Sequence, residues 1–195
     1  GEPSLVWRAA SVLASLFQNN PPCQDGGLDA GALRDLADLV SGTEAASTAT
    51  SSSGADTSIF GMAAWDPAQR AKCRLKAFNA LSALVRAHPR AEDAFLGVGG
   101  EAGRGEGPSG GGGGDGDGDG SAGAQNIDGL SLLHDCLGAD DENLRVKAAF
   151  CLRWFCFARP TCVRGLVDRH TVEVLCNLGC GPAGGEGAGV GDALA

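Results

Sequence analysis

Apolar positions recur every three or four residues in three separate segments of the chain. The segments are RLKAFNALSALVRAHP (74–89), RVKAAFCLRWFCFARP (145–160) and, more loosely, VWRAASVLASLFQNNP (6–21). Each has a basic residue beside an apolar one near its start, contains no Gly, and meets a Pro only at its end. A period of three to four residues is that of an amphipathic helix. The pattern therefore predicts one kind of long helix, used three times.

The second segment, together with the residues just before it, has two faces. Helical spacing places an apolar stripe on one face: Leu75, Phe78, Leu81, Leu84 and Val85. It places polar and basic residues on another: Lys72, Lys76, Asn79 and Arg86. The apolar stripe of such a helix packs against its neighbours, and the polar face is left for solvent or for a partner.

Low-complexity inserts separate the three copies. Residues 41–66 are rich in Ser, Thr, Ala and Gly, and residues 98–126 are rich in Gly. Without these inserts, successive copies are about 42 residues apart, within the roughly 40–47 residues of armadillo and HEAT repeats. We expect the inserts to be disordered surface loops, because loop closure costs only about 0.6 kcal/mol more for each doubling of length.

Shorter helical patterns lie between the long ones. Residues 25–42 and 126–141 carry leucines at helical spacing. Asp25 or Asp29 is available to cap the first of these helices, and Gly138 is the expected end of the second. Residues 161–179 would start a fourth unit. The order short, short, long predicts an all-α fold, an armadillo-type right-handed superhelical solenoid of three to four repeats over residues 1–178, followed by a disordered Gly-rich tail over 179–195.

Composition supports a helical fold and restricts the partners. Tyr is absent, Trp and Phe number 3 and 7, and runs of β-branched residues are missing, which argues against a β-sandwich or barrel. A formal net charge of −9 disfavours nucleic acid and anionic membranes as partners. No apolar run approaches the roughly 18 residues of a membrane span. The long segments nevertheless carry a local excess of Lys and Arg.

The 8 cysteines show no CxxC pair. Several of them, such as Cys151 and Cys156, occupy apolar positions of the helical pattern, where a free Cys acts as a small hydrophobic residue. We therefore expect reduced thiols in an intracellular protein.

Motifs that suggest other chemistry are weak. DGDGDG (115–120) matches the start of a calcium loop but lacks the final Glu and flanking helices, and GCGPAG (179–184) lacks the strand and helix of a dinucleotide site. His88, His134 and His170 are isolated, and no nucleophile or carboxylate pair has a catalytic context. We expect no metal, no cofactor and no enzymatic activity.

The repeated pieces resemble the armadillo-repeat nucleotide exchange factors of heat-shock protein 70, the Fes-type and Hsp-binding-protein family. The similar pieces are WRAA (7–10), QNNP (18–21), GAL (31–33), LKAFNALSALVR (75–86) and RVKAAFCL (145–152). The resemblance covers the chain outside the two inserts and the tail.

The resemblance implies a co-chaperone. Such a factor binds the nucleotide-binding domain of heat-shock protein 70 through its concave side, opens the nucleotide cleft and promotes ADP release, and no bond is made or broken. We expect a cytoplasmic monomer, with the lumen of the endoplasmic reticulum as the alternative compartment.

Solvent-side positions of the long helices are the expected contacts with this partner. They are Arg8, Gln18, Asn19, Lys72, Lys76, Asn79, Arg86, Lys147 and Trp154. In the third copy, Phe150, Trp154 and Phe157 replace Asn79, Ala83 and Arg86. We expect these aromatic residues to pack against the fourth unit, and the alternative is that Trp154 is an exposed contact anchor.

Two other functions fit parts of the sequence. A generic armadillo scaffold that binds an extended peptide would want a regular ladder of groove Trp and Asn, of which only Trp154 and Asn79 are candidates. A hydrolase formed by the inserts would need ordered structure there, which their composition disfavours.

Overall fold

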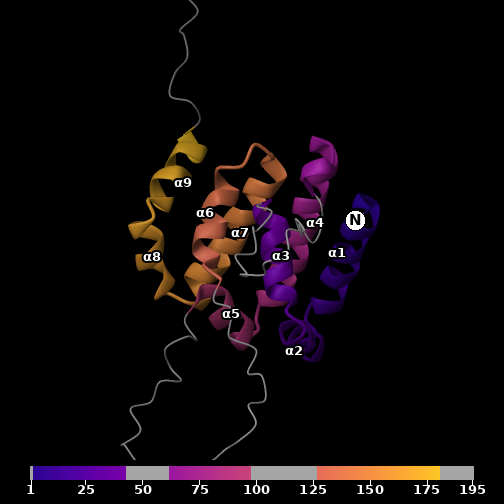
Figure 1. Ribbon diagram of the computed structural model, residues 1–195. Coiled ribbons are helices and arrows are strands. Elements are labelled where there is room, and N and C mark those ends of the chain that lie inside the picture. The colour runs from indigo at the N-terminus through magenta and orange to yellow at the C-terminus, as the bar shows by residue number, and fades with distance from the viewer. Residues whose placement is uncertain (1, 43–61, 98–126, 181–195) are drawn as a thin grey trace, which may run out of the picture.

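Every regular element in the part of the chain that the structure describes is a helix (Figure 1). The structure is a computed structural model, and it describes residues 2–42, 62–97 and 127–180. The predicted all-α class is confirmed. Residues 43–61, 98–126 and 181–195 lie outside the described residues. The predictions for most of both inserts, for the DGDGDG motif and for most of the tail fall on these ranges.

Three long helices alternate with pairs of short ones, as predicted. The long helices are α1 (Pro3–Phe17), α4 (Pro67–Val85) and α7 (Glu142–Ala158). The short ones are α2 (Pro21–Asp29), α3 (Ala32–Ser41), α5 (Pro89–Leu96), α6 (Gly129–Leu137), α8 (Cys162–Asp168) and α9 (Thr171–Cys180), with a 3-10 turn η1 (Met62–Ala64) before α4.

Local signals set where the helices begin. Pro occupies the first turn of α1, α2, α4 and α5, where its missing N–H costs nothing. Asp66 caps α4 in a reciprocal capping box with Gln69, and Asp141 caps α7. Each cap satisfies N–H groups that have no partner inside the helix.

The predicted caps at Asp25 and Asp29 are wrong. Pro21 starts α2 earlier than the leucine pattern indicated, so Asp25 lies inside this helix and Asp29 ends it. Both carboxylates instead bind Arg90 of α5. The predicted end of α6 at Gly138 is confirmed, since Gly138 is its C-terminal cap.

The helices lie in two rows (Figure 1). The long helices form one row, in which α4 packs extensively on α1 and more sparsely on α7. The helices α3, α6 and α9 form the second row, in which α6 contacts both of its neighbours, and α3 and α6 pack on α4 and α7 respectively. The core lies between the rows.

Aromatic residues tie successive helices together in this core. Phe78, Phe95 and Phe155 are among the largest fully enclosed side chains. The rings of Phe95 on α5 and Phe155 on α7 stack with centroids 5.4 Å apart, an arrangement that adds to the gain from burial alone.

The low-complexity boundaries need two corrections. Met62 and Trp65 lie in the predicted first insert, yet both are buried in the core, because they are large apolar side chains next to α4. At the other end, α9 runs to Cys180 and so includes the first two residues of the predicted tail. Among the described helices, none combines the length and the apolar character needed to cross a bilayer.

Candidate functional site

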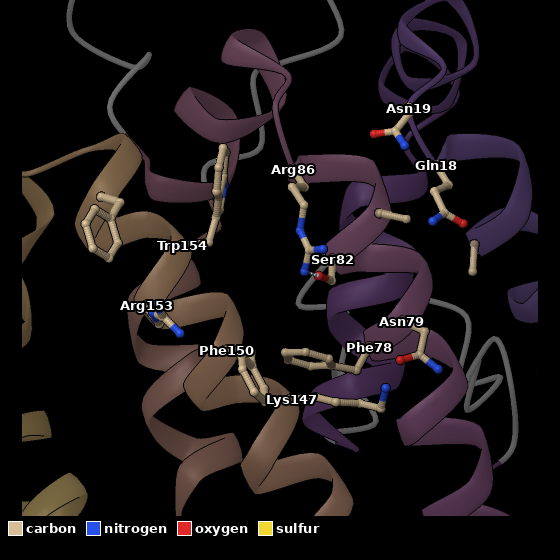
Figure 2. Close-up of a pocket in the computed structure, with 13 residues that line it drawn as sticks. Gln18, Asn19, Phe78, Asn79, Ser82, Arg86, Lys147, Phe150, Arg153 and Trp154 are labelled. Atoms are coloured by element: carbon tan, nitrogen blue, oxygen red, sulfur yellow. Dashed lines mark hydrogen bonds between the residues drawn. The ribbon is translucent and has the colours of Figure 1, made fainter.

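A groove of about 840 Å³ lies between α4 and α7, with the C-terminal end of α1 at its rim (Figure 2). We call it the α4–α7 groove. The two long helices contact each other sparsely, and α3 packs on α4 while α6 packs on α7. Its wall on the α1 side is completed by Ala14, Gln18 and Asn19.

The α7 wall is aromatic. Phe150, Trp154 and Phe157 follow one another at helical spacing and line the groove. Phe150 is 61% exposed and Phe157 is 76% exposed, so the expectation that they pack against a fourth unit is wrong. The opposite face of α7, which includes Leu152 and Phe155, is the one that is buried.

Trp154 was expected to pack against the fourth unit or to be an exposed contact anchor, and it is neither fully buried nor fully exposed. It is partly buried against the core, and it also lines the groove. Its indole Nε1 is enclosed and has no hydrogen-bond acceptor among the described residues. A buried donor without an acceptor costs about 1–3 kcal/mol.

The α4 wall mixes polar and apolar side chains, and Arg86 lies at its C-terminal end. The Arg86 Nη2 donates to the Ser82 Oγ at 3.2 Å. The Arg86 side chain lies between the α7 wall and the α1 rim (Figure 2). Behind it, the buried amide of Gln24 donates to the carbonyl oxygens of Ala83, Leu84 and Arg86 at 2.9–3.1 Å. These bonds fix the last turn of α4 and with it the position of Arg86.

The groove is positively charged although the chain has a net charge of −9. Its lining contains Arg86, Lys147 and Arg153, and no Asp, Glu or His. The Arg153 guanidinium lies 6.0 Å from the centroid of the Phe157 ring, within the range of a cation–π contact. Cationic and aromatic side chains therefore share one surface.

Six of the nine predicted contact residues line this groove. They are Gln18, Asn19, Asn79, Arg86, Lys147 and Trp154. Arg8, Lys72 and Lys76 do not line it. The Lys72 Nζ on α4 instead lies 3.8 Å from the centroid of the Trp7 ring on α1, and so joins these two helices. The Arg8 guanidinium lies 5.4 Å from the same ring, within α1 itself.

Sequence reasoning missed part of the lining. Phe78 was assigned to the core, and it is buried, but it also reaches the groove, where its ring faces Phe150 (Figure 2). Arg153 contributes to the basic excess of the third long segment, but its position in the sequence alone did not assign it to the groove. The sequence did not indicate that Ser82 and Ala83 line a groove, because small residues in a helix fit a core position as well as a groove position.

The lining can bind but offers no acid–base pair. Cys151 lies just behind Ser82 and Arg86, and its burial raises the pKa of the thiol to about 11 in spite of these two neighbours. This thiol is therefore protonated and unreactive at neutral pH. The described residues also contain no group of three His, Cys, Asp or Glu side chains that could hold a metal ion.

Comparisons of the chain with known protein families, with curated protein sequences and with solved structures gave no match. The resemblance of the repeated segments and the chemistry of the α4–α7 groove are therefore the basis for a proposed function.

Proposed function

We propose that this chain is an armadillo-type co-chaperone that binds the nucleotide-binding domain of heat-shock protein 70 and promotes ADP release. The observation that carries the proposal is the groove itself: a surface of three cations and three exposed or half-buried aromatic residues in an acidic protein. Aromatic residues and Arg are enriched where proteins bind one another.

The repeated contacts between helices support the solenoid. Two full triplets, α2–α3–α4 and α5–α6–α7, follow α1, and α8 and α9 begin another. Each triplet packs on the next through matching rows, as repeats do when none can bury its apolar face alone. We infer three to four armadillo-type units that wind into a right-handed superhelix, with the α4–α7 groove on the concave side.

The activity would follow from differential binding. An exchange factor needs only to bind the open form of the chaperone better than the closed, ADP-bound form, and a tenfold preference corresponds to about 1.4 kcal/mol. The positive groove would also speed encounter with an acidic surface of the chaperone. No group in the groove lining is required to act as an acid, a base or a nucleophile.

The test is the release rate of a fluorescent ADP analogue from purified heat-shock protein 70, with and without the chain. We expect faster release with the wild-type chain and loss of the acceleration with Arg86→Glu/Lys147→Glu. The matched control is Arg164→Glu, since Arg164 is exposed on α8 and lies outside the groove. Equal rates with and without a chain that circular dichroism shows to be folded would refute the proposal for that chaperone.

One observation favours a second candidate, the scaffold that binds an extended peptide. Asn79 and Trp154, the two residues that such a scaffold would use, line the same groove from opposite walls. The two proposals differ in the ligand, because the scaffold would bind an unstructured peptide and leave the rate of ADP release unchanged.

A further inference from the structure

The cations of the α4–α7 groove carry no partner of opposite charge. Among the described residues, none of Arg86, Lys147 and Arg153 forms an ion pair with a carboxylate. Arg86 donates only to the neutral Ser82 hydroxyl. By contrast, Arg90, Arg159 and Arg169, which lie outside the groove, each bind a carboxylate of this chain. The groove therefore keeps positive charge available for an occupant.

The spacing of the groove residues along α7 matches a helical occupant. Lys147, Phe150, Trp154 and Phe157 follow one another at three, four and three residues, which is about 5 Å along the axis for each step. One face of a second helix presents side chains at the same interval, whereas one face of an extended strand presents them about 6.6 Å apart. A helix therefore stays in register over the length of this wall.

We propose that the α4–α7 groove binds an acidic amphipathic helix of its partner. Carboxylates at successive turns of that helix face Lys147, Arg153 and Arg86, and apolar side chains between them pack on Phe150 and Phe157. The inference deepens the proposed function, because it names the element of the partner that the groove takes.

A displayed library of helical peptides tests this without the chaperone. Peptides of about 14 residues, long enough for the whole α7 wall, carry random residues on one face and a side-chain staple on the other, and they are selected on the wild-type chain. We expect the selected faces to be enriched in Asp and Glu next to Leu, Ile or Phe. Enrichment in Lys and Arg, enrichment in neutral faces or no selectable binder would each overturn the proposal.

Three controls test where the selected peptide binds and whether it binds as a helix. A selected peptide should bind Arg86→Glu/Arg153→Glu at least about tenfold more weakly, as loss of two complementary charges predicts, and should bind the Arg164→Glu control unchanged. The same peptide with Pro in its centre should lose affinity, and equal affinity would mean that the occupant is extended. In an ¹H–¹⁵N spectrum the Trp154 indole signal, assigned by Trp154→Phe, should shift on binding, because Trp154 lines the groove.

These outcomes separate the inference from the proposed function. Selection of acidic helices without accelerated ADP release would retain the groove ligand and refute the chaperone as its source. Accelerated release without selection of acidic helices would retain the exchange activity and refute the helical ligand.

Discussion

Gln24 and Glu92 occupy equivalent positions and make equivalent contacts in successive units. Each is buried three residues after the Pro that follows a long helix, and each binds the C-terminal end of the next long helix. The Gln24 amide donates to carbonyl oxygens at the end of α4, and the Glu92 carboxylate accepts from Arg159 at the end of α7 at 2.8 Å. One buried polar contact thus sets the spacing between units twice.

Gln24→Ala should lower the free energy of unfolding by about 2–3 kcal/mol. The change leaves carbonyl groups at the end of α4 without their donor, and buried acceptors without a partner cost about 1–3 kcal/mol. Urea unfolding followed by circular dichroism measures the effect. Gln18→Ala, at an exposed position of the groove rim, is the control and should change stability by less than about 0.5 kcal/mol. An equal effect of the two substitutions would refute the role of Gln24.

Arg159→Ala should destabilise the protein more than Glu92→Gln does. Removing Arg159 leaves the Glu92 carboxylate, whose side chain is only 6% exposed, buried without a counter-charge, at a cost of about 2–3 kcal/mol. Glu92→Gln keeps the shape and removes the charge, so its cost should be near 1 kcal/mol. The double variant should be more stable than the sum of the two predicts. Arg34→Ala, which breaks an exposed pair with Asp38, should cost less than about 0.5 kcal/mol.

Much of this architecture is readable from local sequence. The three long helices follow from apolar spacing and from Pro at their boundaries, because both signals act within a few residues. The pairing of Arg90 with Asp25 and Asp29 was not predictable in this way, since it joins residues about one repeat and one insert apart. Local sequence alone therefore predicts helix caps at these two carboxylates.

The aromatic wall of the groove was misassigned for a different reason. α7 is apolar on two faces, one with Phe150 and Phe157 and the other with Leu152 and Phe155. Periodicity locates both faces but does not say which one a neighbouring helix covers. The positions of α3, α6 and α8 determine which face of α7 is covered. Those positions depend on contacts between residues that are distant in sequence.

Ala87→Gly should raise the free energy of unfolding by about 0.5–1 kcal/mol. Ala87 is exposed and has a φ of 58°, a left-handed conformation that Gly adopts without the strain of a Cβ. The equivalent turn after α1 has Asn19 at a φ of 53°, and Asn tolerates this region better than Ala, so Ala87→Asn should also stabilise. Ala9→Gly, inside α1, should destabilise by about 1 kcal/mol. Thermal unfolding and urea unfolding both measure whether each substitution raises or lowers the free energy of unfolding.

Buried cysteines should react far more slowly than the exposed Cys176. Burial raises the pKa of the thiols of Cys73 and Cys151 to about 11 and that of Cys136 to about 12, which leaves little of the reactive thiolate at pH 8. Cys176 is exposed. Maleimide labelling followed by mass spectrometry should modify Cys176 before Cys73, Cys136 and Cys151, and urea should remove the difference. Equally fast labelling of Cys136 in the folded protein would contradict its placement in the core.

Asp128 should contribute a stability that is lost at low pH. Partial burial raises the pKa of this carboxyl, but hydrogen bonds from Arg169 and from the backbone and side chain of Ser131 outweigh burial and hold the pKa below its usual value of 3.8. Because the folded state binds this proton less readily than the unfolded state does, the contribution is complete above the unfolded pKa and disappears as pH falls through the folded one.

Asp128→Asn isolates this charge, since Asn remains a good N-terminal cap for α6. We expect the variant to be less stable than wild type at pH 7 by about 0.5–1 kcal/mol, a small value because the Asp128 side chain is 53% exposed and water screens the pair. The difference should shrink toward zero near pH 3 in urea unfolding. Asp135→Asn, an exposed change on the same helix, should show no such convergence, and a difference for Asp128→Asn that grows on acidification would contradict the sign argued here.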